Sequence, residues 1–280
     1  MDYDADGRTD IVTGSYTGQF YLFRRQADGS FAQRELLVDE AGDTLMMPFK
    51  TVYSVTPELV DMDADGDLDL VVGNRSGAVQ VVTNTGTRRA PVWSKQRQQL
   101  TTVDGQAIQG SNAHHADWDG DGLRDLVVGS EWGEVRWYRN LGANDAPRYA
   151  AGAVLVEKEN APRDPEGTTP KRPGMRVKVH VTDWDEDGRA DLLVGDVTWQ
   201  QATLKPLTAA EEKAKAELER EQAELERKLA AAADDQHRAA TEQARREVST
   251  KLRSYDRTRL NTHGWVWLYR RSSQPARAGR

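Results

Sequence analysis

The chain has 280 residues, of which 38% are apolar and 30% charged, and its formal net charge is −7. The mean hydropathy of −0.75 and the lack of any apolar stretch of ~18 residues exclude a membrane span. The net negative charge argues against a nucleic-acid binder that relies on bulk positive charge. The sequence contains no cysteine, which excludes disulfides and thiolate metal sites.

One acidic motif occurs four times along the chain. Its pattern is D-x-D-x-D-G-x-x-D followed by an apolar run, and its first aspartates lie 59, 56 and 66 residues apart. A second segment, which opens with glycine and alternates apolar residues, follows each copy, as at residues 77–82 and 133–138. The repeat is therefore a supersecondary unit of about 56–60 residues. The four units begin at Asp2, Asp61, Asp117 and Asp183.

Each unit is predicted to contain four strands. The run before the acidic loop is the first, the run after it the second, the glycine-led run the third, and a weaker stretch around Trp93 or Tyr149 the fourth. Units of this kind are typical of propeller blades. We therefore predict a mainly β fold, a β-propeller of four repeats, with an open β-solenoid as the alternative. The residue after the first aspartate of each loop should pack against a neighbouring blade: Tyr3, Met62, Trp118 and Trp184.

The acidic loops have the chemistry of a calcium site. Aspartates at loop positions 1, 3, 5 and 9 present hard carboxylate oxygens, and glycine at position 6 permits a sharp bend. Position 12 is Thr13 or a valine rather than the glutamate of an EF-hand. Turns whose carboxylates only cap backbone amides are the alternative, but four complete copies favour an ion. We predict about one Ca²⁺ per loop, held by Asp2, Asp4, Asp6, Asp10, Asp61, Asp63, Asp65, Asp69, Asp117, Asp119, Asp121, Asp125, Asp183, Asp185, Asp187 and Asp191.

Charge supports this prediction. Four divalent ions would change the formal net charge from −7 to +1. The 16 carboxylates have no evident basic partner inside the loops, so they would repel one another without a cation. We interpret the ions as structural, with binding that contributes folding free energy.

The loops and the strands that follow them resemble the FG-GAP/VCBS repeats of the integrin α-subunit amino-terminal propeller and its bacterial relatives. The resemblance covers residues 1–200 and 262–271 and is most specific in D-x-D-x-D-G-x-x-D-[LI]-[VL]-x-G. It implies a calcium-bearing propeller, usually extracellular or periplasmic, that acts as a binding or scaffolding module. The loop aspartates are the calcium ligands in that family.

A long insertion interrupts the fourth unit. Residues 208–253 contain no glycine or proline and are rich in alanine, glutamate, lysine and arginine, which predicts helix. Because the insertion must return to one β-hairpin, we predict an antiparallel, coiled-coil-like helical hairpin within 205–257, with arms at about 208–232 and 235–254. It is either a solvated spacer or an arm that docks a partner. Residues 272–280 are predicted to be a disordered tail.

The chain starts at the first loop, without a preceding strand or signal peptide, and stops after the third strand of the fourth unit. A ring closed in the usual way would take both missing strands from an upstream segment, since an open ring exposes strand edges. We therefore expect the carboxyl-terminal portion of a longer protein. A compact, complete four-blade ring is the alternative.

Three further polar residues share one place in the repeat. Glu58, His114 and His180 each lie three residues before the first loop aspartate, on equivalent first strands. Two imidazoles and a carboxylate could bind a transition metal or perform acid–base chemistry. Polar residues that only form hydrogen bonds between blades are the alternative.

Two functions follow from these patterns. The first is a non-catalytic, calcium-binding propeller that binds protein or polysaccharide, and no nucleic acid, outside the cytoplasm. The second is a polysaccharide lyase or hydrolase with its site at Glu58, His114 and His180. We favour the first, since the chain has no G-x-S-x-G, P-loop, H-E-x-x-H or cysteine nucleophile.

Overall fold

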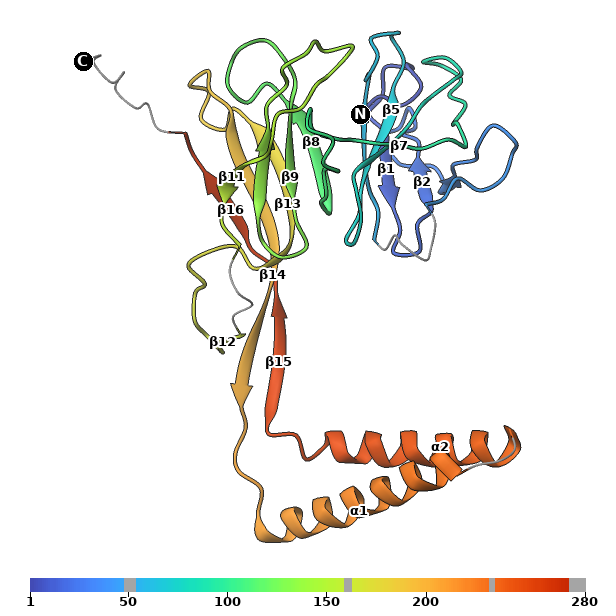
Figure 1. Ribbon diagram of the computed structural model, residues 1–280, viewed down its shortest axis with the longest axis vertical. Helices are drawn as coiled ribbons and strands as arrows, with labels where there is room; N and C mark the ends of the chain where they lie inside the picture. Colours follow the sequence, from blue (N-terminus) through green and yellow to red (C-terminus); the bar gives the residue numbers. More distant parts are fainter. Residues whose placement is uncertain (48–53, 159–162, 232–234, 272–280) are drawn as a thin grey trace, which may run out of the picture. The chain divides into compact units, whose positions relative to one another are not determined.

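The computed structural model describes residues 1–47, 54–158, 163–231 and 235–271 (Figure 1). The fold is mainly β with two helices, as the sequence predicts. The chain divides into two units. One comprises Met1–Pro162, Pro170–Thr198 and His263–Arg280, and the other Arg163–Thr169 and Trp199–Thr262. The predicted disordered tail lies outside the described residues.

The first unit contains four sheets, one for each repeat, and within this unit their strands are antiparallel and neighbour one another in chain order. The first is β1 (Ile11–Gly14), β2 (Phe20–Phe23) and β3 (Glu35–Leu36). The second is β4 (Thr56–Val60), β5 (Asp69–Gly73), β6 (Gln80–Val82) and β7 (Gln98–Gln99). The third is β8 (Asn112–Ala116), β9 (Asp125–Gly129), β10 (Val135–Tyr138) and β11 (Ala153–Val156). The fourth is β13 (Met175–Thr182), β14 (Asp191–Thr203) and β16 (Val266–Tyr269).

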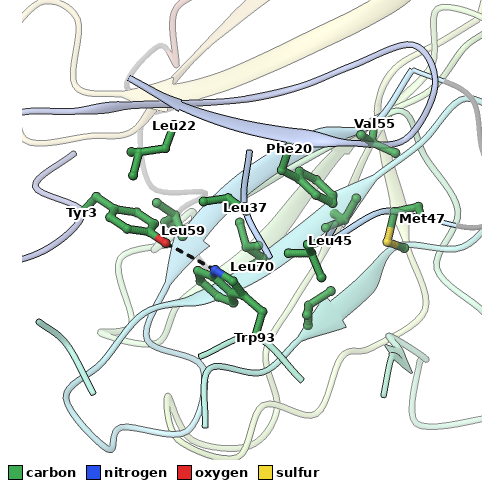
Figure 2. Packing of buried hydrophobic residues seen from close by; sticks show 12 residues of the cluster. Tyr3, Phe20, Leu22, Leu37, Leu45, Met47, Val55, Leu59, Leu70 and Trp93 are labelled. Carbon is green, nitrogen blue, oxygen red and sulfur yellow. Dashed lines mark hydrogen bonds between the residues drawn. The ribbon is translucent and has the colours of Figure 1, made fainter. Parts of the chain in front are cut away.

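The hydrophobic core lies between successive sheets. Figure 2 shows the cluster between the first two, where Phe20 and Leu45 meet Leu70. Val71, the next residue of β5, belongs instead to the cluster shared with the third sheet, and a third cluster joins the third and fourth sheets. Alternate side chains of a strand point to opposite faces. The second strands are therefore continuous apolar runs because both of their faces are covered.

Residues at loop position 2 pack onto the following sheet in three repeats. Tyr3 and Trp118 are buried and Met62 packs against the second cluster. The Tyr3 and Trp93 rings lie 6.3 Å apart between centroids, and Trp93 Nε1 donates to the Tyr3 hydroxyl at 3.3 Å (Figure 2). The prediction is wrong for Trp184, which is 58% exposed. The described residues provide no fifth sheet to cover it.

The fourth strands do not lie where the sequence places them. They are β7 and β11, which begin after Trp93 and Tyr149. Each of these aromatic residues instead forms an isolated bridge, to Asn84 and Asn140 respectively. A second bridge joins Trp93 to Asp39 and Tyr149 to Thr102, each in the preceding repeat. The two aromatic residues therefore link adjacent repeats rather than extend a sheet.

The second unit contains the helical insertion. β14 continues into it, where β12 (Arg163–Pro165) pairs with β14 in parallel and β15 (Thr258–His263) also pairs with β14. Helix α1 (Ala209–Ala231) and helix α2 (Asp235–Arg253) follow the predicted spans. A capping box begins α1: Thr208 N donates to Glu211 Oε2 at 2.7 Å, and Glu211 N donates to Thr208 Oγ1 at 3.3 Å.

None of these sheets closes on itself within the described residues. Neither described helix is both long and apolar enough to cross a lipid bilayer.

The insertion should be dispensable for the stability of the first unit. Replacing residues 200–262 by Asn-Arg-Ser would restore a short turn like that at 74–77. The deletion leaves the three interrepeat core clusters intact, because none of their members lies within it. We expect unchanged β-structure by circular dichroism and an unchanged calcium-dependent melting transition. Loss of the cooperative transition would show that the insertion belongs to the core.

Candidate metal centres

Each acidic loop leads into the second strand of its repeat and bends sharply at two positions. The position-6 glycines have φ between +83° and +91°, a conformation that favours glycine: Gly7, Gly66, Gly122 and Gly188. Position 4 is also left-handed, at Ala5, Ala64, Gly120 and Glu186. The sequence pattern does not signal this second bend, because three of the four residues there are not glycine. Together the two bends turn the chain back around the first aspartate.

The first aspartate organises the loop through backbone amides. Asp2 accepts from Asp6 N at 3.1 Å and from Gly7 N at 3.0 Å. Asp117 accepts from Gly120 N, Asp121 N and Gly122 N at 2.8, 3.1 and 2.9 Å. This folding leaves the remaining carboxylates close together.

Every loop gathers three carboxylates tightly. In each, one oxygen from each of three aspartates lies within 4.8 Å of the other two. The described residues place four such groups in the chain: Asp2, Asp4 and Asp6; Asp61, Asp63 and Asp65; Asp117, Asp119 and Asp125; and Asp183, Asp185 and Asp191. The clusters could each hold a metal ion, and a donor set made only of oxygen suits a hard cation.

Buried oxygens in three loops lack a hydrogen-bond partner among the described residues. They are Oδ1 of Asp4, Oδ1 of Asp61 and Oδ1 of Asp119. A buried carboxylate oxygen without a donor is costly, because it has lost water and gained no substitute. A cation among the three carboxylates would supply that interaction. The residues present therefore fit a divalent ion.

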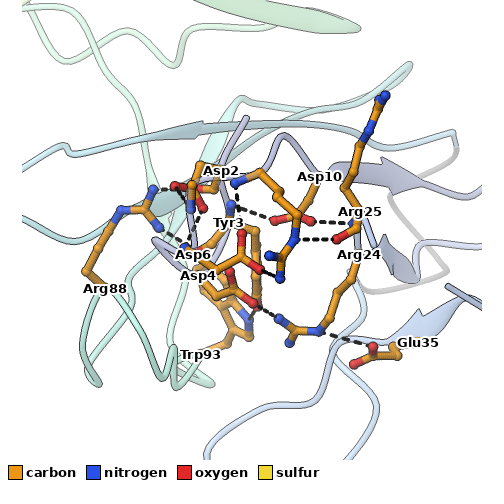
Figure 3. A network of polar contacts seen from close by, with 12 residues as sticks. Asp2, Tyr3, Asp4, Asp6, Asp10, Arg24, Arg25, Glu35, Arg88 and Trp93 are labelled. Carbon is orange, nitrogen blue, oxygen red and sulfur yellow. Dashed lines mark hydrogen bonds and ion pairs between the residues drawn. The ribbon is translucent and has the colours of Figure 1, made fainter. Parts of the chain in front are cut away.

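Basic side chains contact the loops, contrary to the expectation from sequence. In the first loop, Arg24 pairs with Asp4 and Arg8 with Asp6 (Figure 3 shows the first pair). In the third, Arg139 pairs with Asp119 at 2.7 Å and Asp121 at 2.9 Å. Arg24 and Arg139 directly follow β2 and β10, the third strands of their repeats. They were missed because they lie about 20 residues beyond the loop.

The second loop differs, since no ion pair to its carboxylates is found in the described part of the chain. It carries an additional acid, Asp67, which is buried and whose Oδ1 has no hydrogen-bond partner among the described residues. Burial raises the pKa of Asp67, and the charges of Asp65 and Asp63 raise it further. Burial also raises the pKa of Asp69 to about 6, against the lowering effect of two backbone hydrogen bonds. Asp67 is thus a further candidate ligand that the sequence pattern overlooked.

The aspartate at position 9 of each loop also accepts backbone hydrogen bonds. Asp125 Oδ2 accepts from Trp118 N at 3.2 Å and Oδ1 accepts from Asn140 N at 2.7 Å. Equivalent pairs of bonds occur in every repeat, at Asp10, Asp69, Asp125 and Asp191. These residues are buried. The carboxylate at position 9 therefore connects the loop to the residues that follow the third strand, whether or not it also contacts an ion.

Residues 117–194, which span the third loop through the second strand of the fourth repeat, match the profile of a family described as FG-GAP-like repeat. The chain carries an FG-GAP-like repeat. No curated protein and no solved structure matches the chain. The match includes two of the four acidic loops, and the other two have the same spacing and backbone geometry.

The repeats also bring together the polar residues that share one offset. Glu58 Oε1 lies 3.1 Å from His114 Nδ1, and the ring centroids of His114 and His180 lie 4.6 Å apart. His115, one residue further on, was not singled out as a member. Its Nδ1 lies 2.7 Å from Glu58 Oε2, and its Nε2 lies 3.1 Å from the Tyr149 hydroxyl. The group thus links three first strands, β4, β8 and β13.

Glu58 should stabilise the fold in a pH-dependent manner. Burial alone would raise the pKa of Glu58, but hydrogen bonds from His114 and His115 outweigh it and lower the pKa to about 2. A carboxyl whose pKa is depressed on folding stabilises the folded state above its ordinary value of 4.5 and loses that effect as the pH falls to about 2.

The corresponding measurement compares the chain with the Glu58→Gln variant by denaturant unfolding from pH 7 to pH 2. We expect a difference in unfolding free energy of about 3 kcal/mol at pH 7 that shrinks between pH ~4.5 and ~2. The variant keeps the shape and one acceptor, so packing is preserved. A difference that stays constant over this range would contradict the assigned ion pairs.

Proposed function

We propose that the chain is a calcium-stabilised β-propeller segment that acts as a non-catalytic binding module outside the cytoplasm. The observation that carries the proposal is the cluster of three carboxylates within 4.8 Å in every acidic loop. The partnerless buried oxygens of Asp4, Asp61 and Asp119 support it. Calcium fits these loops because it accepts many oxygen ligands in flexible geometry, whereas Mg²⁺ demands a near-ideal octahedron.

The propeller geometry is supported by the serial packing of the sheets. Each repeat forms its own antiparallel sheet, and each core cluster joins one sheet to the next. This is how blades pack around a propeller axis. The location outside the cytoplasm is supported by the FG-GAP-like repeat, which is typically extracellular. The ligand class on this proposal is protein or polysaccharide.

Single-loop variants test the calcium assignment. Asp119→Asn retains the shape of a loop carboxylate but removes its charge, and we expect it to reduce the number of bound Ca²⁺ by about one, measured by titration calorimetry. Asp43→Asn is the matched control, because Asp43 is exposed and forms an ion pair with the exposed Lys95 rather than with a loop residue. Equal calcium binding by both variants would refute the assignment for the third loop.

Polysaccharide cleavage is a second candidate function, favoured by the contact between Glu58 and His114. A carboxylate that accepts from one imidazole nitrogen orients the other nitrogen as a general base. On this proposal, His114→Gln should abolish release of new sugar ends from an acidic polysaccharide, while His237→Gln in α2 should leave it unchanged. Release that His114→Gln does not affect would exclude this site.

The helical insertion is proposed as a docking arm for a partner. Its helices carry mostly exposed charged side chains, and Val248 of α2 is buried. The alternative is a solvated spacer. Retention of a native partner by a chain that lacks residues 200–262 would favour the spacer.

A further inference from the structure

A cavity of about 460 Å³ lies in the first unit, at the ends of the strands opposite the acidic loops. It is bordered by the turns that follow β5 and β9, by the beginning of β13, and by the segment before β16. Its volume falls within the range of ~300–1,000 Å³ that is usual for small-molecule sites. The residues that determine its chemistry are Arg75, Glu131, Arg176, Lys178, Asp196 and Trp265.

Two arginines of the cavity share one buried carboxylate. Arg75 forms a fork with Glu131, with Nε to Oε2 at 2.8 Å and Nη2 to Oε1 at 2.5 Å. Arg176 Nε lies 3.3 Å from Glu131 Oε1. Arg176 also has φ +58°, a conformation that a non-glycine residue adopts at some energetic cost and that recurs at functional sites. Glu131 thus pairs with both arginines.

Lys178 has no carboxylate partner within ion-pair distance among the residues described. Its Nζ donates to Thr56 Oγ1 at 2.6 Å and to the Ser111 carbonyl at 2.7 Å, both neutral acceptors. Burial lowers the pKa of Lys178 to about 8, since desolvation disfavours its charged form. An anion beside the ammonium group would reverse that effect.

The second carboxylate of the cavity is already engaged. Asp196 accepts from Gly174 N at 2.5 Å, from Trp265 N at 2.9 Å and from Trp267 Nε1 at 3.1 Å. It is buried and fixes the backbone of the segment before β16. The Trp265 indole nitrogen, in contrast, finds no acceptor among the described residues and is shielded from solvent. The cavity therefore combines three cations and two carboxylates with the aromatic ring of Trp265.

We propose that this cavity binds the carboxylate of an acidic sugar, a uronic acid unit of a polysaccharide, with Lys178 as its cationic partner. The net positive charge of the lining selects an anion. Trp265, which borders the cavity, offers an aromatic ring of the kind on which flat apolar faces of sugars pack. The proposal rests on the proposed binding function and names its ligand class.

Titration calorimetry on the full calcium-loaded chain tests this inference, with a galacturonate disaccharide as the probe. A neutral galactose disaccharide and a short acidic peptide are the comparison ligands. We expect binding of the acidic disaccharide alone. Lys178→Met should weaken it by roughly tenfold or more, because a hydrogen bond between charged groups is lost. Trp265→Ala should weaken it by roughly threefold to tenfold, because the aromatic ring on which the sugar packs is lost.

Lys158→Met is the matched control, since Lys158 is exposed and outside the cavity, and it should bind as the unchanged chain does. No binding of the acidic disaccharide, equal binding by Lys178→Met, or binding of the peptide in its place would overturn the inference. The calcium-dependent melting of each variant is measured in parallel. A chain that keeps this dependence but does not bind the sugar refutes the cavity assignment and leaves the calcium proposal standing.

Discussion

Removal of calcium with excess EGTA should lower the melting temperature of the chain by about 10 °C or more. The physical reason is the concentration of negative charge in the loops, where three carboxylates lie within 4.8 Å of one another in each of four clusters. Without a cation these groups repel, and the buried oxygens of Asp4, Asp61 and Asp119 lack hydrogen-bond partners in the part of the chain that the structure describes. Each ion that binds only the folded state adds to its stability by mass action.

The control for this experiment is EGTA that has been saturated with Ca²⁺, which should leave the melting curve unchanged. Addition of Mg²⁺ to the stripped chain should restore less stability than Ca²⁺, because Mg²⁺ demands near-ideal octahedral geometry and gives up its bound water reluctantly. A melting curve that EGTA does not move would contradict the structural role of the ions.

The Asp125→Ala variant should be destabilised by about 3 kcal/mol even without calcium. Asp125 is fully buried, and its two oxygens accept from Trp118 N and Asn140 N. Alanine leaves both amides without an acceptor inside the protein, and each such loss costs roughly 1–3 kcal/mol. Denaturant unfolding in EGTA measures the part of the effect that no ion can explain.

Two comparisons separate this role from ion binding. Asp125→Asn retains one acceptor and should cost less than Asp125→Ala. Asp119→Asn should cost stability mainly when calcium is present, because the Asp119 carboxylate accepts no backbone amide in the described hydrogen bonds and pairs with the exposed Arg139. Equal losses of unfolding free energy for Asp125→Ala and Asp119→Asn in EGTA would contradict the assignment of backbone hydrogen bonding to Asp125 and of ion binding to Asp119.

The repeat made much of the fold predictable. The motif spacing indicates four similar sheets, and the glycine at position 6 indicates a bend that the structure has at Gly7, Gly66, Gly122 and Gly188. The two helices were predictable because a long segment without glycine or proline has no strand alternation. In each case the signal is local in the sequence.

Interactions between repeats were harder to predict. Trp93 and Tyr149 are aromatic residues of the kind common in strands. Each instead bridges two repeats, because the preceding repeat places a backbone partner beside it, Asp39 and Thr102 respectively. Trp184 follows the same pattern as Trp118 but is exposed, since burial at this position depends on the following sheet. The motif alone contains no information about what lies beside it.

The candidate sites, too, were predictable only where the repeat pattern marks their residues. A shared offset before the loops was enough to single out Glu58, His114 and His180, because equivalent strand positions come together when repeats pack in series. Arg139, which reaches the third loop, and Lys178, which borders the cavity, have no motif of their own. Their roles follow from residues distant in sequence and required the structure.

Calcium stoichiometry tests the central claim most directly. The chelator-stripped chain is titrated with Ca²⁺ in a calorimeter, and the bound metal is counted independently by atomic emission after dialysis. Four clusters of carboxylates predict about four Ca²⁺ per chain, with the number falling by about one in Asp119→Asn. A chain that binds no Ca²⁺ at millimolar concentration, while folded and monodisperse, would contradict the claim that the acidic loops are calcium sites.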